Sequence, residues 1–378
     1  MKKVFFLSIL FFTFFSCTGS AKQPVAIEQV KDSTLHSDTL SLLFAGDLMQ
    51  HQAQIDAART ANGYDYSSYF KFIKDEIESV DLAIGNLEVT LGGKPYRGYP
   101  AFSAPDEYLT AIRDAGFDVL ITANNHCLDS GRKGLERTIN LLDSMNIPHA
   151  GTYINAIERE KQYPLMLEKK GFRIALLNYT YGTNGIKVTS PNIVNYIDTA
   201  VIAKDIQISK EKHPDAIIAC MHWGIEYESL PNKEQVFLTD WLLKKGVTHV
   251  IGSHPHVVQP MEVRQDSLTG NKHLVVYSLG NFISNMSVRR TDGGLMVKME
   301  LVKDSTTRLN HCEYSLVWVA RPIQSGWKNH TLIPVNMPED SLPVNTRNPL
   351  RIFTNDARTL FNKHNRGIKE YIFYKKNP

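Results

Sequence analysis

Short apolar runs alternate with longer amphipathic segments along most of the chain. The apolar runs of the first half are predicted strands, because each is short and is followed by glycine or polar residues. They are Leu40–Ala45, Asp81–Ile84 and Asp118–Thr122. Segments with apolar residues at helical spacing separate and follow these strands, namely Ser67–Ser79, Asp106–Ala115 and Gly131–Met145.

The second half repeats this alternation. Its predicted strands are Arg173–Tyr179, Asp215–Met221, Thr248–Ile251 and Val275–Ser278. Its predicted helices are Thr199–Lys212 and Lys233–Lys245. Two later segments, Gly294–Val302 and Glu313–Arg321, alternate apolar and polar residues as antiparallel strands do. The whole pattern predicts a layered α/β fold with antiparallel strands near the C-terminal end.

The two ends of the chain differ from this pattern. Met1-Lys2-Lys3 is positively charged, and the apolar run that follows it is Val4–Phe15. This run is too short for an ordinary membrane-spanning helix, and a charged start before a short apolar run is typical of a signal peptide. The Ser16-Cys17 junction resembles a bacterial lipoprotein processing site, at which lipid is attached to Cys17; ordinary secretion is the alternative. We predict a signal peptide over 1–17, a tether over 18–39, a main domain over 40–321 and a C-terminal appendage over 322–378.

Composition narrows the class of protein. The formal net charge of +3 falls to +1 without Lys2 and Lys3, so a nearly neutral mature protein argues against nucleic acid as a partner. Three cysteines besides Cys17 show no paired spacing and give no disulfide framework. They are Cys127, Cys220 and Cys312. We interpret them as buried packing residues, with ligation by thiolate as the alternative for Cys127 and Cys220.

Polar side chains gather where the predicted strands end. Asp47 follows a glycine, which lets the backbone of such a loop approach closely. In open α/β sheets, ligands collect at the carboxyl ends of the strands. The candidates at these ends are Asp47, Glu88, Asn125, His126, His222, His254 and His256.

This set of carboxylate, amide and imidazole groups suits Mn, Fe or Zn ions. It is larger than one open site needs, so we predict one or two divalent ions, with a bridging carboxylate holding a pair roughly 3.5–4 Å apart. Such ions lower the pKa of bound water towards about 7. His126, with Asp129 three residues on to orient it, is the candidate general acid that protonates a leaving group.

The ordered series of motifs resembles the CapA family, the poly-γ-glutamate capsule synthesis proteins, whose domain is similar to the calcineurin-like metallophosphoesterases. The motifs are Gly46-Asp47-Leu48-Met49, Asn86-Leu87-Glu88, Ala123-Asn124-Asn125-His126, His222-Trp223-Gly224-Ile225-Glu226-Tyr227, His254-Pro255-His256-Val257-Val258-Gln259 and Ser278-Leu279-Gly280-Asn281-Phe282. The resemblance extends from about residue 42 to 302 and implies a layered α/β sandwich of the metallophosphoesterase type.

The resemblance also implies site residues. By it, the metal ligands are Asp47, Glu88, Asn125, His222, His254 and His256, and His126 is the proton donor. Two positions depart from the phosphoesterase pattern. Met49 stands where that pattern has a histidine, with His51 too far along, and Gly85-Asn86-Leu87-Glu88 replaces Gly-Asp-x-x-Asp. One metal position is therefore expected to be weak, or filled only with substrate.

Two further loop residues are candidates with alternatives left open. Glu226 either orients His222 or is a solvated loop acid, and Asn281 either serves the same centre or is a turn asparagine. Basic residues near these loops either hold a polyanion such as poly-γ-glutamate or are scattered surface charges. They are Arg97, Arg132, Lys133, Arg289 and Arg290.

The sequence thus predicts an extracytoplasmic, lipid-anchored metal-dependent hydrolase that acts in poly-γ-glutamate or other capsule polymer metabolism. Water activated by the ions would attack a γ-amide or phosphoester, with His126 protonating the leaving group. The expected partners are the anionic polymer, the membrane and proteins of capsule synthesis and export. The alternatives are a non-enzymatic assembly factor with a structural metal site, which Met49 favours, and a phosphoesterase for envelope metabolites.

Overall fold

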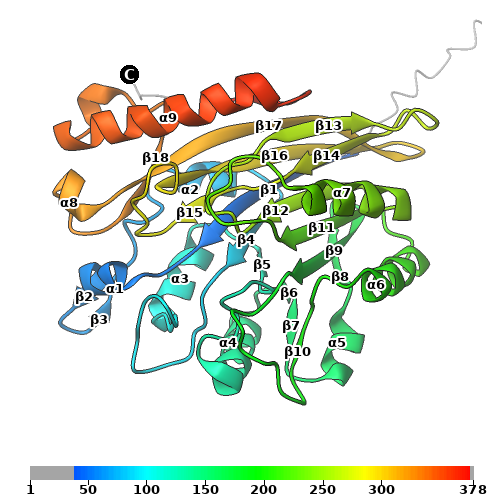
Figure 1. Ribbon diagram of the computed structural model, residues 1–378, viewed down its shortest axis with the longest axis horizontal. Coiled ribbons are helices and arrows are strands. Elements are labelled where there is room, and N and C mark those ends of the chain that lie inside the picture. Colours follow the sequence, from blue (N-terminus) through cyan, green and yellow to red (C-terminus); the bar gives the residue numbers. More distant parts are fainter. Residues whose placement is uncertain (1–37, 375–378) are drawn as a thin grey trace, which may run out of the picture. The chain divides into compact units, whose positions relative to one another are not determined.

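Two β-sheets face each other in the protein, which we describe from a computed structural model (Figure 1). The structure describes residues 38–374. Apolar side chains from the strands of both sheets share one hydrophobic cluster, and helices cover the outer sides. The layered α/β sandwich predicted from the sequence is therefore confirmed.

The first sheet is mixed, with its strands in the order β18-β17-β16-β1-β4-β5-β6. Strands β1, β4, β5 and β6 are parallel, whereas β16, β17 and β18 continue the sheet antiparallel, as the sequence predicts for this part of the chain. Two short strands join it, β15 beside β1 and β19 beside β17. The bounds are β1 Asp38–Leu48, β4 Leu82–Leu87, β5 Val119–Ile121, β6 His149–Ala150, β15 Asn281–Ile283, β16 Gly293–Lys303, β17 Thr307–Ala320, β18 Thr331–Pro334 and β19 Lys369–Glu370.

The second sheet has the order β13-β14-β12-β11-β9-β8. Its four central strands are parallel, and β8 and β13 close the two edges antiparallel. The bounds are β8 Leu165–Lys169, β9 Phe172–Thr180, β11 Ala216–His222, β12 His249–Ser253, β13 Met261–Gln265 and β14 Lys272–Val276. Two small ribbons lie apart from it, β2 Arg59–Thr60 with β3 Gly63–Tyr64, and β7 Thr152–Tyr153 with β10 Ile193–Val194.

Alternation along the central strands assigns each side chain to a layer. In β1, Leu42 and Phe44 belong to the cluster that the two sheets share, whereas Leu43 and Ala45 pack in the cluster of α2 and α3. Strands buried on both faces read as nearly continuous apolar runs, which is why the sequence marks them so clearly.

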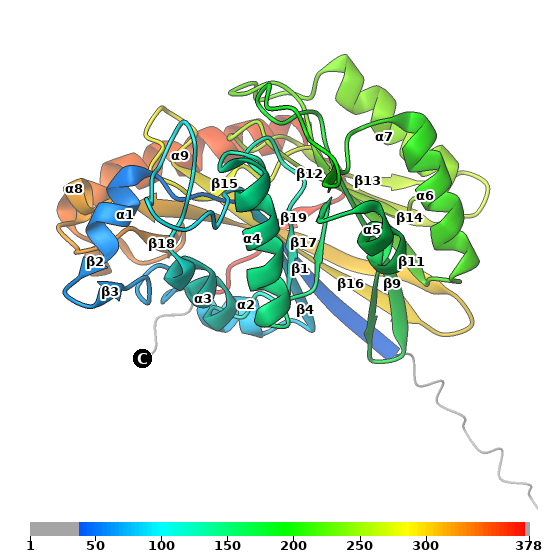
Figure 2. The same cartoon turned by 90° about the horizontal axis from the view of Figure 1, so that it is seen from below.

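Helices flank the two sheets on opposite sides (Figure 2). Helices α2 and α3 contribute to the cluster outside the first sheet, and α6 and α7 to the cluster outside the second. The bounds are α1 Gln52–Ala58, α2 Lys74–Glu78, α3 Asp106–Asp114, α4 Gly131–Ser144, α5 Ala156–Gln162, α6 Thr199–Glu211, α7 Lys233–Lys245, α8 Pro322–Ser325 and α9 Val344–His364.

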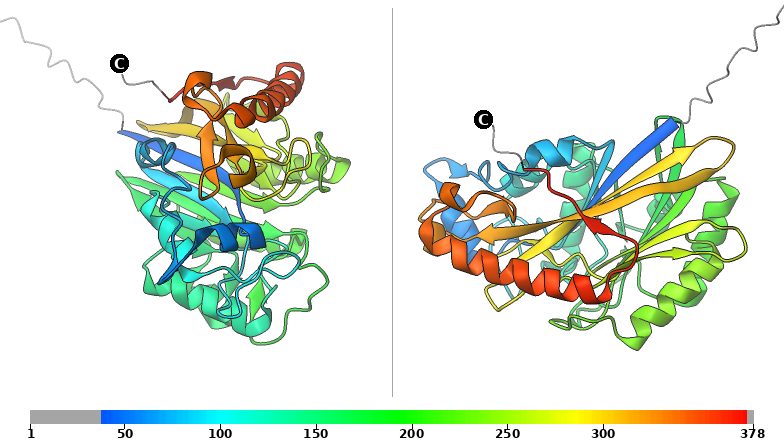
Figure 3. Two further views of the ribbon diagram at one scale, coloured as in Figure 1. Left: turned by 90° about the vertical axis from the view of Figure 1, so that its left-hand side faces the viewer. Right: turned by 90° about the horizontal axis from the view of Figure 1, so that it is seen from above.

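The C-terminal residues predicted as an appendage pack against this core as far as Tyr374. Strand β18 extends the first sheet, and α9 lies across its strands (Figure 3, right). Buried Phe353 and Phe361 of α9 belong to the same hydrophobic cluster as the strands, and the Phe361 ring lies 5.0 Å from that of Tyr314. Residues beyond 321 therefore contribute to the core of this unit.

The predicted helix Ser67–Ser79 is wrong over its first half, because only Lys74–Glu78 is helical. Tyr69 and Ile73 instead close tight turns by donating to the carbonyl oxygens three residues earlier. The Tyr69 ring packs against Tyr66 and Tyr108 at centroid distances of 5.0 and 6.2 Å. Burial of these rings outweighs the helical spacing of the sequence.

The predicted signal peptide, Cys17 and most of the tether lie outside the described residues. Within residues 38–374, none of the helices combines the length and apolar character needed to cross a bilayer.

Candidate metal centre

The candidate site lies where parallel strands of both sheets end. In the first sheet, Asp47 is the last residue but one of β1 and Glu88 directly follows β4. In the second, His222 is the last residue of β11 and His254 directly follows β12. All four side chains are buried. Because β1 is parallel to β4 and β11 is parallel to β12, their carboxyl ends bring residues far apart in sequence to one place.

A glycine contact sets the position of Asp47. The register of β1 shifts between Ala45 and Asp47 relative to β4, as at a β-bulge. A Cβ atom on Gly46 would collide with the carbonyl group of Gly280, and the Asp47 N–H donates to that same oxygen at 3.0 Å. The close approach that the sequence predicts for this glycine is thus present, and it positions Asp47 at the candidate site.

Asp47, Glu88 and His222 form a group whose potential ligand atoms all lie within 4.8 Å of one another. His222 Nε2 lies 3.7 Å from Glu88 Oε1 and 2.8 Å from the side-chain oxygen of Asn125. The Asn125 amide donates to Asn184 at 3.1 Å, which directs its oxygen towards His222. The structure therefore brings these four predicted ligands together.

One oxygen of each carboxylate in this group has no hydrogen-bond partner among the described residues. Asp47 Oδ2 and Glu88 Oε1 are buried and accept no hydrogen bond, and no Lys or Arg among the described residues pairs with either side chain. Burial and the charge of Asp47 raise the pKa of Glu88 well above its ordinary value. Burial also opposes ionisation of Asp47, but contact with His256 lowers its pKa.

Buried carboxylates are normally paired or bound to a metal. Burial and the neighbouring imidazole of His254 lower the pKa of His222 well below its ordinary value. Burial and His256 lower the pKa of His254 to about 3. Both rings are thus neutral at ordinary pH, which is the form that binds metal ions. The donor set fits a divalent cation, and the group indicates that the protein uses one.

Asn86 is a site residue that the sequence analysis treated only as a departure from a motif. Its amide nitrogen donates to Asp47 Oδ1 at 2.8 Å and to Glu88 Oε2 at 3.2 Å, and it lies 3.4 Å from His222 Nδ1. The Asn124 amide in turn donates to the Asn86 oxygen at 3.2 Å. Asn86 therefore holds the two carboxylates in place by donating to both. Its position between Gly85 and Glu88 was the sequence feature from which this role could have been predicted.

His256 is oriented by Asn281. The Asn281 amide donates to the Thr291 carbonyl at 2.8 Å, so its oxygen faces His256 Nδ1 at 3.0 Å and accepts from that nitrogen. His256 Nε2, which then carries the lone pair, lies 3.9 Å from Glu88 Oε1. Asn281 thus contacts a predicted ligand, as expected of a residue that fixes an imidazole tautomer.

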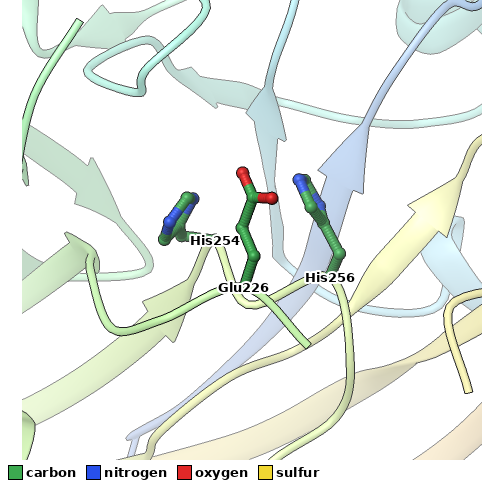
Figure 4. A group of neighbouring side chains, drawn as sticks. All are labelled: Glu226, His254 and His256. Atoms are coloured by element: carbon green, nitrogen blue, oxygen red, sulfur yellow. The ribbon is translucent and has the colours of Figure 1, made fainter. Parts of the chain in front are cut away.

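His254, His256 and Glu226 form a second group whose potential ligand atoms lie within 4.8 Å of one another (Figure 4). The Glu226 carboxylate lies between the two imidazoles in this view. The sequence analysis considered Glu226 as a partner of His222, and the structure places it with the other two histidines.

His126 and Asp129 lie beside the centre and form a buried pair. His126 Nδ1 donates to Asp129 Oδ2 at 2.7 Å, and the same oxygen accepts from the Phe102 N–H at 2.8 Å. His126 Nε2 has no hydrogen bond among the described residues. His126 lies near enough to His222 and His254 to contribute to the lowering of their pKa values, so the three rings share one environment. The pair has the geometry predicted from its spacing.

Other candidates lie outside the two ligand groups. Met49 is buried in the cluster of α2 and α3, and His51 precedes α1 with a pKa lowered to about 4 by burial. Cys127 and Cys220 are buried in hydrophobic clusters, and burial raises the pKa of Cys127 to about 12. A thiol of such high pKa supports the packing interpretation of Cys127.

Tyr181 was missed by the sequence analysis. Its ring centroid lies 4.4 Å from that of His254 and is stacked on His222 at 6.3 Å, while 47% of the residue is exposed. It directly follows β9 and lies beside the strand ends that carry His222 and His254. Aromatic residues at strand ends are too common for this position to be recognised without the fold.

The fold and these side chains define a class of protein, an α/β sandwich with a candidate metal centre of carboxylates and histidines at its strand ends. Within that class the chain belongs to the bacterial capsule synthesis protein family PGA_cap, whose family model matches residues 41–286. This confirms the resemblance to CapA proteins seen in the sequence motifs.

Individual relatives agree. The chain is 28% identical over 302 residues to the PGA biosynthesis protein CapA of Bacillus subtilis (strain 168), covering 78% of this chain and 74% of the relative. It is 27% identical over 289 residues to the capsule biosynthesis protein CapA of Bacillus anthracis, covering 72% and 67%.

Two solved structures are similar at low sequence identity. The NAD nucleotidase of Haemophilus influenzae gives a TM-score of 0.44 at 10% identity and covers 89% of this chain. The 5′-nucleotidase of Candida albicans gives 0.41 at 12% identity and covers 85%. The chain spans 58% of the length of each of these two proteins.

Proposed function

We propose that the protein is a metal-dependent hydrolase that cleaves a γ-amide or phosphoester bond of an envelope polymer during capsule biosynthesis. The observation that carries this proposal is the pair of buried, unsatisfied carboxylate oxygens of Asp47 and Glu88 beside neutral His222. Family membership supports the link to capsule polymers.

The residues of the centre have separate roles in this reaction. A divalent Mn, Fe or Zn ion held by Asp47, Glu88, His222 and Asn125 would lower the pKa of water and polarise the bond to be cleaved. Asp129 holds the proton on His126 Nδ1, and the backbone N–H of His126 donates to Asn124 at 3.1 Å. His126 is thereby positioned to pass a proton from Nε2 to the leaving group.

Basic residues near the centre support an anionic polymer such as poly-γ-glutamate as the substrate. A cleft of about 430 Å³ beside Val257 and Val258, just after His256, is lined by Arg289, Arg290 and Lys363. Arg289 pairs with Asp356 at 2.6 Å, which leaves Arg290 and Lys363 as the cations without a carboxylate partner among the described residues that line the cleft. We propose that polymer carboxylates enter here, and that proteins of capsule synthesis and export act with this protein.

The second candidate is a non-enzymatic assembly factor that binds the polymer and keeps a structural metal. Met49 favours it, because the position where the phosphoesterase pattern has a histidine holds a side chain that packs in a hydrophobic cluster and offers no carboxylate or imidazole. A phosphoesterase for envelope metabolites is the third candidate, and the same assays separate all three.

The test measures metal content and turnover together. Protein purified without chelator should hold at least one divalent ion per chain, and His222→Ala should lose it, whereas His311→Ala, at an exposed site, should keep it. With Mn²⁺, Fe²⁺ or Zn²⁺ supplied in turn, turnover of poly-γ-glutamate or of a generic phosphoester should follow metal content.

Each outcome has a clear meaning for the proposal. A protein that takes up none of these ions contradicts the metal-dependent hydrolase. A protein that holds metal and binds poly-γ-glutamate but turns over neither substrate is the assembly factor. Turnover of the phosphoester alone identifies the phosphoesterase.

A further inference from the structure

Glu226 faces two buried histidines without pairing with either of them. The potential ligand atoms of Glu226, His254 and His256 lie within 4.8 Å, yet no hydrogen bond or ion pair joins the carboxylate to the imidazoles among the described residues. Atoms that bind one transition-metal ion at about 2.0–2.2 Å lie roughly 3–4 Å from one another. The exposed Glu226 side chain therefore needs only a small movement inwards to complete such a site.

The histidines offer ligand atoms to this space. His256 uses Nδ1 to donate to Asn281, which leaves Nε2 free. His254 is 2% exposed, and its Nδ1 has no hydrogen-bond partner although it is buried. An unsatisfied nitrogen of this kind costs stability unless a further group binds in the site.

Backbone hydrogen bonds hold the Glu226 loop against the histidine turn. The Tyr227 N–H donates to the Pro255 carbonyl at 2.8 Å, directly between the two ligand segments. The Gln259 side chain donates to the carbonyl oxygens of Glu228 and Leu230 at 2.8 and 3.2 Å. The position of Glu226 next to the turn is thus built into the fold.

Three of the residues in these loops have strained backbone conformations. The φ angles are 69° at Tyr227, 104° at His254 and 57° at His256, all in the region that favours glycine. Such backbone conformations are unfavourable for residues other than glycine and cluster at functional sites, where the surrounding structure holds them. Here the strain falls on the residues that aim the second group of ligands.

We propose that Glu226 binds a second divalent ion directly, together with His254 and His256. This inference rests on the proposed metal-dependent function and adds a ligand to it. The Glu226 carboxylate would supply one metal ligand in place of the histidine that Met49 replaces. Glu88 Oε1 lies 3.7 Å from His222 Nε2 and 3.9 Å from His256 Nε2, so this oxygen is near a histidine of each group.

The experiment titrates metal-free full chain with Mn²⁺ and measures bound equivalents and affinities by calorimetry. The wild type should bind two ions, and Glu226→Gln should keep the first while the affinity for the second falls by about 100-fold or more, above the 10–100-fold typical of residues that only orient ligands. Gln keeps an oxygen that accepts hydrogen bonds but loses the charge that a metal ligand needs. Glu228→Gln, two residues along the same exposed loop, is the matched control and should bind as the wild type does.

Electron paramagnetic resonance gives a second readout. Two adjacent Mn²⁺ ions should give an exchange-coupled signal in the wild type that Glu226→Gln replaces with the signal of a single ion. Two sites of unchanged affinity in Glu226→Gln overturn this inference and leave the proposed function intact. A wild type that binds one ion also overturns it, whereas a wild type that binds no ion contradicts the proposed function itself.

Discussion

Four asparagine side chains surround the carboxylates and imidazoles of the metal centre. They are Asn86, Asn124, Asn125 and Asn281. Each amide N–H donates a hydrogen bond that fixes the orientation of the asparagine itself or of a neighbouring side chain. The candidate ligand atoms are thereby oriented by neutral groups, which add no charge to the site. A buried site that already holds Asp47 and Glu88 benefits from neutral donors, because further unpaired charge there would be costly.

Among single residues, the proposed role of His126 as the proton donor can be tested most directly. His126→Ala should leave metal content nearly intact and reduce turnover by roughly 10²–10⁴-fold, the usual contribution of a positioned proton donor. Asp129→Asn should reduce turnover less, because it changes only the orientation and proton affinity of the ring. Turnover is measured on the substrate found active, with metal content determined on the same samples.

Two results would contradict this assignment. If His126→Ala loses its metal, His126 is a ligand. If turnover is unchanged with metal retained, another group donates the proton.

At the scale of elements, the site depends on close contacts between strands and loops. Strand β1 can present Asp47 only because Gly46 allows the backbone of Gly280 to approach. The turn at Gly280 leads into β15, which carries Asn281 and pairs in parallel with β1. One glycine contact thus places both the candidate ligand Asp47 and the residue that contacts His256.

Gly46→Ala should therefore separate β1 from β15. We expect a loss of about 1–3 kcal/mol in the free energy of unfolding, as for other additions of a methyl group to a tightly packed place. Metal affinity should fall as well, because Asp47 and Asn281 move apart. Chemical denaturation and Mn²⁺ titration measure the two effects.

Gly182→Ala is the control, since a Cβ atom there meets no neighbour within 4 Å. A Gly46→Ala protein as stable as this control would show that the close approach is not required.

At the scale of the whole molecule, segments from both ends of the described chain complete one core. Strand β1 is central in the first sheet, and β18 and α9 join the same sheet from the C-terminal side. Phe353 of α9 is 2% exposed, and its ring packs so closely on Gly293 of β16 that a Cβ atom there would collide with it. The C-terminal residues therefore stabilise the sheet whose strand ends carry Asp47 and Glu88.

Phe353→Ala should lower the free energy of unfolding by about 3–5 kcal/mol, the range for a buried phenylalanine. Ile352→Ala, at the neighbouring residue that is 41% exposed, should have a much smaller effect. Chemical denaturation of the two variants makes the comparison. Equal midpoints would mean that α9 contributes little to the core.

The location of the protein in the cell, like its stability, is a property of the whole molecule. We propose that Cys17 carries lipid and holds the protein on the outer side of a bacterial membrane. Radiolabelled fatty acid should enter the wild type and Cys312→Ala but not Cys17→Ala. Because one acyl chain gives only marginal binding, multiple acylation is expected. Equal labelling of all three, or labelling of none, would contradict the lipid anchor.

The sequence by itself determined the central strands of both sheets, the helices between them and most of the residues that meet at the candidate centre, but not edge strands such as β8 and β13 or helix α9. Strands buried on both faces read as apolar runs, and their polar ends stand out against them, so Asp47, His222 and His254 could be recognised as strand-end residues. Parallel strands then imply that these ends meet. The spacing of His126 and Asp129 was likewise enough to predict their pairing, because it is a local property.

Only the tertiary structure decided which of these residues lie together. Glu226 and His254 lie in loops after different strands, and nothing local indicates that Tyr227 bonds to Pro255 and brings them together. The roles of Asn86 and Tyr181 and the packing of α9 depend in the same way on contacts between distant segments. Periodicity reports which face of an element is buried, whereas the partner across that face is fixed by the packing of the whole chain.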